Sequence, residues 1–375
     1  MLPLDGVRVA EFCQIAAGPF AGLLLADAGA DVVKVEPPSG DGMRQWPPLT
    51  GGFSENFAAV NRNKRSIVLD LKTPAGLSAA RKLCLASDIV LENFRPGGMQ
   101  RLGLGAEAMM REKPSLVYCS VSAFGQEGPR AQEGGFDVTI QAISGVMSVT
   151  GEPGGAPVKC GVPVSDFAAG LYAAFACSNA LLKARASGEG TRIDVPMMGT
   201  TLAIAALQTS EYFGNGRDPV KLGSAHPRNA PYQAFRCADG HFVMAAGNDD
   251  LFRSACAGLG MEGAASDPRF GSTSLRASNQ SALRELVEAA CASRTAAECL
   301  AILREAGVPC APINSYSQAL ADPQVAHYGW VHPLQLPDGT QSRTFLSPLG
   351  PAAPARRRPP ALGEHTNEIL EEIGA

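Results

Sequence analysis

The chain has 375 residues, which favours two or three domains and suffices to bury a sizeable core. It carries 32 Lys and Arg against 36 Asp and Glu, a net charge of −4 at pH 7, so no nucleic-acid partner is expected. Hydrophobic residues make up 45%, and the 41 Gly and 28 Pro are spread along the chain, which excludes collagen-like and disordered classes. Composition therefore predicts a soluble globular protein.

Short apolar runs alternate with helical stretches over the first 120 residues, a pattern typical of an α/β domain with a parallel sheet. Strands are predicted at 7–12, 31–36, 65–71, 88–93 and 115–124. Helices are predicted at 19–29, 74–86 and 105–113. The strands are short and apolar, as buried parallel strands are.

From Phe136 the pattern becomes helical, with helices predicted at 136–147 and from Asp166 to about 186, a strand at 191–195 and a helix to about 213. The helix that begins at Asp166 is apolar on nearly every face, so we expect it to be buried against the sheet or a second subunit. Its many Ala and Gly residues would let another backbone approach closely.

A Gly- and Pro-rich segment at 214–231 predicts a domain boundary. A hairpin is predicted after it, from 232–237 and 241–247, because Ala-Asp-Gly joins two strand-like runs. Amphipathic helices follow at 249–259, 279–291 and 295–306, then a returning crossover at 307–314. The tail is expected to hold short strands and a helix at 365–373.

Neither a membrane span nor a signal peptide is expected. No run of 18 uncharged apolar residues occurs, and the first 12 residues lack the basic segment and apolar core of a signal peptide. A cytoplasmic location is therefore predicted. The ten cysteines lie mostly in apolar stretches without a C-x-x-C pair, so they are expected to be reduced and buried, with no metal site.

Common catalytic motifs do not occur. The first predicted strand–helix turn has Gly18 and Gly22 but not G-x-G-x-x-G, and neither a Walker A motif, H-E-x-x-H nor G-x-S-x-G is found. Six basic residues near predicted strand ends remain as candidates for a phosphorylated ligand: Arg62, Lys64, Arg65, Lys72, Arg95 and Arg101. Solvated loop charges are the alternative interpretation.

Asp166 stands at the start of the apolar helix. The simple interpretation is an N-cap or first-turn acid, which contributes about 1 kcal/mol to helix stability. The same position also keeps a carboxylate ionised in apolar surroundings, which a carboxylate nucleophile needs. The residues themselves leave both interpretations open.

In sequence the chain resembles the class III CoA-transferases, a family that includes the α-methylacyl-CoA racemases. The matching blocks are PLDGVRVAEF, AAGPFAGLLLADAGADVVKVEPPSGD, NKRSIVLDLKTPAG, DIVLENFRPGGMQRLGLG, SVSAFGQEGP, GVPVSDFAAGLYA and GEGTRIDV. The resemblance implies a doubly wound, mainly parallel sheet in a large domain, a smaller α+β domain, and two interlocked subunits. It places the large CoA-binding domain at 1–213 and 325–375, the small domain at 232–306, and linkers at 214–231 and 307–324.

The resemblance also implies a mechanism in which Asp166 attacks an acyl-CoA thioester, and the CoA then passes through an aspartyl anhydride and an aspartyl-CoA thioester to an acid. No permanently bound cofactor or metal is implied, because CoA thioesters are substrates; the partners are an acyl-CoA, a small organic acid and a second copy of the chain. The expected binding residues are Ala16, Ala17, Lys72, Asn93, Phe94, Arg101, Leu102, Phe136 and Asp137.

Residue differences from particular members of the family restrict the substrates and the reaction that we expect. Ala16, Pro37, Gly134 and Phe136, with the loop 245–250, replace residues of formyl-CoA:oxalate members, so that pair of substrates is not expected. Phe136 also stands where racemases have a proton-accepting histidine, which disfavours racemase chemistry. The segment that begins at 223 is more similar to members that use dicarboxylic acids such as succinate, and succinyl-CoA is one candidate donor.

Alternatives remain beside the transferase. The first is an acyl-CoA racemase or isomerase, and the second is a CoA-binding protein without chemistry. A nicotinamide dehydrogenase is weaker because the glycine fingerprint is missing. Within the transferase interpretation, His226 and Arg228 are candidates to bind the distal carboxylate of the acid, with a plain interdomain turn as the alternative.

Overall fold

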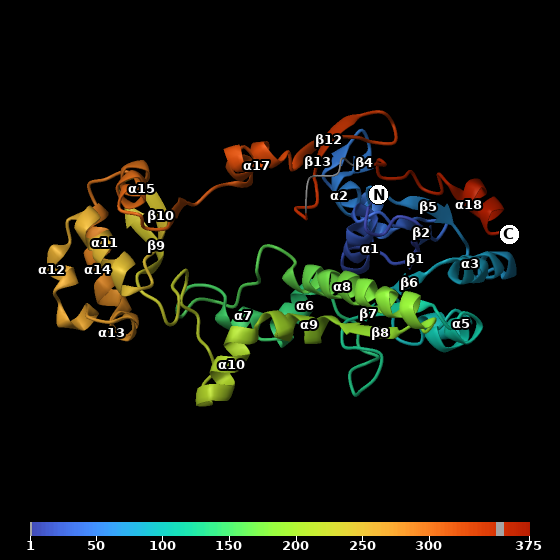
Figure 1. Ribbon diagram of the computed structural model, residues 1–375, viewed down its shortest axis with the longest axis horizontal. Helices are drawn as coiled ribbons and strands as arrows, with labels where there is room; N and C mark the ends of the chain where they lie inside the picture. Colours follow the sequence, from blue (N-terminus) through green and yellow to red (C-terminus); the bar gives the residue numbers. More distant parts are fainter. Residues whose placement is uncertain (1, 350–355) are drawn as a thin grey trace. The chain divides into compact units, whose positions relative to one another are not determined.

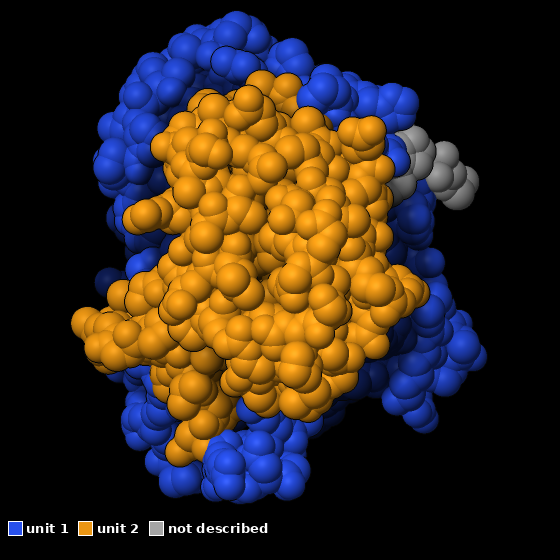
Figure 2. All heavy atoms as spheres, turned by 90° about the vertical axis from the view of Figure 1, so that its left-hand side faces the viewer, with its two compact units in different colours: residues 1–147, 159–217, 323–375 blue, residues 148–158, 218–322 orange. Residues whose placement is uncertain are grey.

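The computed structural model describes residues 2–349 and 356–375. The chain forms two compact units, coloured separately in Figure 2. Unit 1 consists of residues 1–147, 159–217 and 323–375. Unit 2 consists of residues 148–158 and 218–322.

Unit 1 is built on a parallel sheet of six strands (Figure 1). Its strands are β1 (Arg8–Phe12), β2 (Asp31–Glu36), β5 (Arg65–Val68), β6 (Ile89–Glu92), β7 (Val117–Ser122) and β8 (Arg192–Pro196). They lie in the order β5-β2-β1-β6-β7-β8, and every neighbouring pair is parallel. The order reverses between β1 and β6, so the predicted doubly wound α/β sheet is confirmed.

Helices cover both faces of this sheet. On one face α1 (Ala17–Asp27) and α8 (Val164–Ser187) share a core with apolar side chains of β1, β6 and β7. On the other face lie α3 (Pro74–Ala86), α5 (Ala106–Glu112) and the C-terminal α18 (Thr366–Glu372). The tail of the chain thus completes a layer begun in its first third.

Helix α8 approaches α1 closely, as its small residues predict. A Cβ on Gly170 would lie 2.8 Å from the carbonyl oxygen of Ala17, so glycine permits this contact. The helix begins at Val164, two residues before the predicted start, because Pro163 occupies the N-cap position. Among the described residues α8 is long and apolar enough to cross a membrane, but its position on α1 and β7 makes it a core helix.

Within the single chain α8 packs on the sheet and α1 as predicted, but part of its surface stays exposed. Burial of that part against a second subunit, which the sequence also allowed, stays a prediction. Leu171, Phe175 and Leu182 are 55%, 67% and 69% exposed. These three side chains and the partly exposed Tyr172 form an apolar surface that we call the outer face of α8. The composition of a helix cannot distinguish burial within one chain from burial against another.

Two predicted helices of unit 1 are divided. Gly145 adopts a φ of 84°, which separates α6 (Asp137–Ile143) from α7 (Val146–Val149). The helix predicted to end near 213 consists of α9 (Met197–Ile204) and α10 (Ala206–Asn215). The remaining elements are η1 (Gly42–Gln45), β3 (Leu49–Thr50), β4 (Phe53–Ser54), α2 (Glu55–Asn61), α4 (Gly98–Arg101), α17 (Pro323–Tyr328), β12 (Val331–Gln335) and β13 (Gln341–Phe345).

Unit 2 contains a three-stranded sheet and its own apolar core. The predicted hairpin is confirmed, since β9 (Tyr232–Cys237) pairs antiparallel with β10 (Gly240–Ala245). The segment predicted as a crossover contains β11 (Cys310–Pro312), which pairs with β10. The helices are α11 (Asp249–Leu259), α12 (Glu262–Ala265), η2 (Pro268–Phe270), α13 (Thr273–Ser278), α14 (Gln280–Cys291), α15 (Ala296–Glu305) and α16 (Tyr316–Leu320).

Candidate active site

A cavity of about 360 Å³ opens in unit 1 where the strand order reverses. Its walls come from the segments that follow β1, β6 and β7, and from α8. The lining residues are Gln14, Ile15, Ala16, Ala17, Asn93, Phe94, Arg95, Pro96, Val121, Ser122, Ala123, Glu133, Gly134, Gly135, Phe136, Asp166 and Met197. Open α/β sheets bind ligands at this place, so the topology itself identifies the cavity as the candidate site.

The first wall is the turn between β1 and α1, and its backbone is strained. Ile15 has a φ of 67°, a conformation that costs a β-branched residue about 1–3 kcal/mol. The carboxylate of Asp41 holds this turn, because both of its oxygens accept the Ile15 N–H at 3.2 Å. The strained turn presents Ile15, Ala16 and Ala17 to the cavity.

A buried ion network fixes Asp41 in turn. Lys34, with no exposed side-chain surface, lies 2.9 Å from Asp41 and 3.3 Å from Glu11, and it donates to the carbonyl of Cys13 at 2.7 Å. Lys64 lies 2.8 Å from the other oxygen of Glu11. Burial opposes the charged form of Lys34, but the carboxylates of Glu11, Asp41 and Glu36 outweigh it and raise its pKa.

The second wall is the loop after β6, held by hydrogen bonds to its neighbours. The side chain of Asn93 accepts the Gln14 N–H at 3.0 Å and donates to the Gln14 carbonyl at 2.9 Å. These two bonds join the loops after β1 and β6 at the switch point of the sheet, the place where the strand order reverses. The buried carboxyl of Glu92 accepts the Phe94 N–H at 2.8 Å. Burial raises the pKa of Glu92 to about 7.

Asp166 lies in the first turn of α8, and its carboxylate makes no hydrogen bond or ion pair with any described residue. Burial raises its pKa to about 6, and the carboxylate of Asp137 adds to the effect. Asp137 instead caps α8, because it accepts the Ser165 N–H at 2.9 Å, and it also accepts from the Gln141 side chain at 2.7 Å. Asp166 is therefore a partly buried, unpartnered acid that is mostly ionised at pH 7.

The structure divides the predicted ligand-binding residues into two groups. Six of them line the cavity: Ala16, Ala17, Asn93, Phe94, Phe136 and Asp166. Four lie outside its lining: Lys72, Arg101, Leu102 and Asp137. Leu102 borders a separate hollow beside α3 and α5, whereas Lys72 and Arg101 have exposed side chains.

Three of the six basic candidates serve the fold instead of a ligand. Arg62 is paired with Asp27, Lys64 with Glu11, and Arg65 with Asp31, Glu368 and Glu372. All three are buried, so the proposed grip of six side chains on a phosphorylated ligand is wrong for these residues. These residues were candidates because they lie near predicted strand ends. That position does not reveal whether a carboxylate of the fold already pairs with them.

Sequence reasoning did not single out Gln14, Ile15, Ser122, Glu133 and Met197. Gln14 and Ile15 lie two and three residues after the end of the first strand, where a doubly wound sheet places ligands, so their position carried a usable signal. Met197 follows the last strand of the sheet. Neither Glu133 nor Met197 belongs to a recognisable motif.

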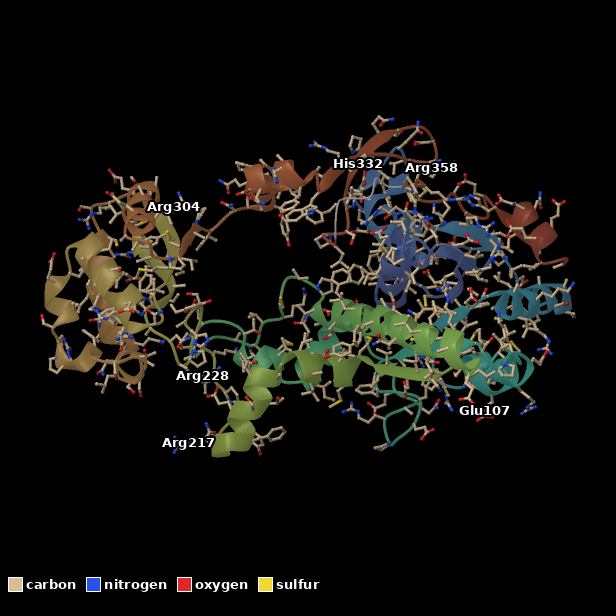
Figure 3. All side chains as sticks on the ribbon, viewed as in Figure 1. Glu107, Arg217, Arg228, Arg304, His332 and Arg358 are labelled. Carbon is tan, nitrogen blue, oxygen red and sulfur yellow. The ribbon has the colours of Figure 1, made fainter. Side chains whose placement is uncertain are left out.

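His226 and Arg228, the earlier candidates for the distal carboxylate, belong to the segment of unit 2 before β9, where Figure 3 labels Arg228. The Nδ1 atom of His226 accepts the N–H groups of Arg228 and Asn229 at 3.1 and 3.0 Å. Burial of His226 lowers its pKa, as does the nearby Arg228. His226 thus organises a turn within unit 2.

Comparison with known proteins agrees with the geometry. The model of "CoA-transferase family III" matches residues 4–366. A succinate–glutarate CoA-transferase of Agrobacterium fabrum is 40% identical over 99% of this chain and 96% of its own, and the human succinyl-CoA:glutarate CoA-transferase is 35% identical over 99% and 86%. The crystal structure of a CaiB/BaiF family protein from Brucella suis superposes with a TM-score of 0.87 at 37% identity, over 99% of each chain. The chain therefore belongs to CoA-transferase family III.

Proposed function

We propose that this enzyme moves CoA from an acyl-CoA to a dicarboxylic acid, with Asp166 as the nucleophile. The observation that carries the proposal is an unpartnered, ionised carboxylate in a cavity at the switch point of the sheet. Relatives whose names specify succinate and glutarate support the substrate class. CoA thioesters are then substrates, with no resident cofactor required.

The proposed reaction exchanges acyl groups in four balanced steps. The Asp166 carboxylate attacks the thioester carbonyl and expels CoA thiolate, which leaves an acyl-aspartyl anhydride. The thiolate attacks the aspartyl carbonyl, so donor acid departs and an aspartyl-CoA thioester remains. The acceptor carboxylate attacks that thioester and expels the thiolate again. The thiolate then attacks the acceptor acyl carbon, which yields the new acyl-CoA and restores Asp166.

The chain supplies three things that this chemistry requires. Apolar walls such as Phe94, Ala123 and Met197 limit the access of water to the anhydride. The rigid turn at Ile15 and the Asn93–Gln14 bonds hold the walls in place before substrate arrives. The unpaired state of Asp166 keeps its oxygens available for attack.

We further propose a homodimer, in which the outer face of α8 is covered by the second copy. An exposed apolar helix face of this kind marks an interaction surface in a folded protein. In the same arrangement unit 1 is the CoA-binding domain and unit 2 the small domain, with linkers near 214–231 and 307–324.

Trapping of the aspartyl intermediate tests the proposal. After mixing with succinyl-CoA and hydroxylamine, the wild type should gain a hydroxamate at Asp166, seen by intact-protein and peptide mass spectrometry. Hydroxylamine cleaves an activated aspartyl ester, so Asp166→Ala should gain nothing. A wild type that stays unmodified with succinyl-CoA and a panel of other acyl-CoAs would contradict the covalent route.

Asp137→Asn should extend activity toward lower pH. Ionised Asp166 is required for attack, so kcat/KM for the acyl-CoA should fall as pH drops below about 6 in the wild type. Removal of the Asp137 charge lowers the pKa of Asp166 and moves this limb to lower pH. For each half unit by which the pKa of Asp166 falls, kcat/KM at pH 5 should rise about threefold. Asn can still accept the Ser165 N–H. An unmoved limb in the pH profile would show that the two carboxylates do not interact.

A further inference from the structure

We propose that Arg95 is the specificity-determining residue that binds the distal carboxylate of the dicarboxylic substrate. The inference rests on the proposed function, since it assigns one contact within the same cavity. Among the described residues that line the cavity, Arg95 is the only Lys, Arg or His. It lies on the loop after β6, whereas Asp166 lies on α8.

The side chain of Arg95 is free to bind a ligand. It is exposed and makes no hydrogen bond or ion pair with any described residue. Glu133, which lines the cavity together with Asp166, is already neutralised, because Arg130 donates to it at 2.7 and 3.1 Å. Three other basic candidates, Arg62, Lys64 and Arg65, are buried and already form ion pairs with carboxylates of the fold.

The chain also leaves space for the guanidinium group. A Cβ on Gly134 would lie 3.1 Å from the Nη2 atom of Arg95, so a side chain at this position would press on the guanidinium. The glycine at position 134 thus removes a steric obstacle beside Arg95.

The loop presents Arg95 on a fixed backbone. On its N-terminal side, Asn93 is bonded twice to Gln14, and the Phe94 N–H is bonded to Glu92. On its C-terminal side, the carbonyl of Arg95 accepts the Gly98 N–H at 2.8 Å. A guanidinium on a rigid loop loses little backbone entropy when it binds a ligand.

The charges of the cavity explain why a cation is needed at one point only. Asp166 and Asp137 place negative charge at the reacting end, where one carboxyl group of the substrate becomes an acyl group and loses its charge. The distal carboxylate keeps its charge throughout, so it needs a permanent cation away from Asp166. Arginine meets that need with paired donors that match the two oxygens of a carboxylate.

Two donors of equal acyl length test the assignment. Succinyl-CoA and butyryl-CoA differ only in whether the acyl chain ends in a carboxylate or a methyl group. For Arg95→Met we expect KM for succinyl-CoA to rise about 10- to 100-fold, because the variant loses the hydrogen bonds to a charged carboxylate. KM for butyryl-CoA should stay within about twofold of the wild-type value. Where butyryl-CoA reacts too slowly, its inhibition constant against succinyl-CoA replaces KM. Arg95→Lys should recover part of the loss.

The control variant is Arg111→Met, which removes one exposed arginine on α5 outside the cavity lining and should change neither constant. Equal weakening of both donors by Arg95→Met would assign Arg95 to the CoA moiety and overturn the proposal, as would no change with either donor. A wild type that forms no Asp166 adduct with either donor is a different result, because it refutes the proposed function itself.

Discussion

Asp166→Asn is expected to abolish CoA transfer while making the folded protein more stable at neutral pH. Loss of a catalytic nucleophile should lower kcat by about 10³-fold or more. The amide keeps the size of the side chain but can neither attack a thioester nor form the anhydride. Steady-state transfer from succinyl-CoA to glutarate measures the loss.

The stability gain follows from the raised pKa of Asp166. An unfolded aspartate ionises near its ordinary value of 3.8, whereas in the folded protein burial and Asp137 raise the pKa to about 6. Ionisation therefore favours the unfolded state, and this penalty grows from pH 4 to pH 6 and is complete at pH 7. Allowing for partial exposure, Asp166→Asn should stabilise the protein by about 2 kcal/mol at pH 7 and by less than about 0.5 kcal/mol at pH 4.

Urea denaturation of the wild type and Asp166→Asn at both pH values checks the second half of the prediction. The two halves are independent, since a variant that lost activity by misfolding would be less stable, not more. An Asp166→Asn variant that retains transfer above about 1% of the wild-type rate would contradict the role of Asp166. Equal stability of both proteins at pH 7 would contradict the raised pKa.

Lys34→Met is expected to destabilise the protein by about 3–5 kcal/mol, because it leaves buried carboxylates without their cation. Lys34 contacts Asp41 and Glu11, and none of these three side chains has exposed surface. The substitution keeps the length of the side chain and removes only the charge and its hydrogen bonds. Thermal and urea denaturation at pH 7 measure the change.

Activity should fall along with stability in Lys34→Met. Without its cation the Asp41 carboxylate keeps, among the described residues, only the N–H groups of Ile15 and Met43 as partners, so it holds the strained backbone of Ile15 less firmly. The turn that lines the cavity then relaxes, so KM for the acyl-CoA should rise even at temperatures where the variant is folded.

Lys82→Met is the matched control, because Lys82 is an exposed lysine on α3 whose only partner among the described residues is the carbonyl of Gly374. Its stability should stay within about 0.5 kcal/mol of the wild type. A Lys34→Met variant as stable as this control would show that the buried network contributes nothing net to folding.

The chain's order of elements was readable from local pattern. Short apolar strands such as 31–36 and 88–93 alternate with helices, and that alternation predicted a parallel sheet, which the structure confirms. The hairpin from Tyr232 was equally clear, because turn residues and strand residues act within a few positions of each other. The division of the helix predicted at 136–147 was missed, although Gly145 marks it.

Charge partners were not readable in the same way. Arg62 and Arg65 lie in one basic segment with Lys72, yet the first two are buried in ion pairs and the third is exposed. The partners that decide this difference stand up to 307 positions away, as Glu372 does from Arg65. Local sequence carries no information about such distances.

The sequence by itself determined the α/β class and the family, and it singled out Asp166 as the candidate nucleophile, since each of these inferences depends on residue type and local order. Only the tertiary structure decided which residues share the cavity and which charges remain free within it. Asp166 lies on α8 and Arg95 on the loop after β6. The packing of these segments beside the point where the strand order reverses brings both residues to the same cavity. Their chemistry depends on burial and on nearby charge, and both of those are set by folding.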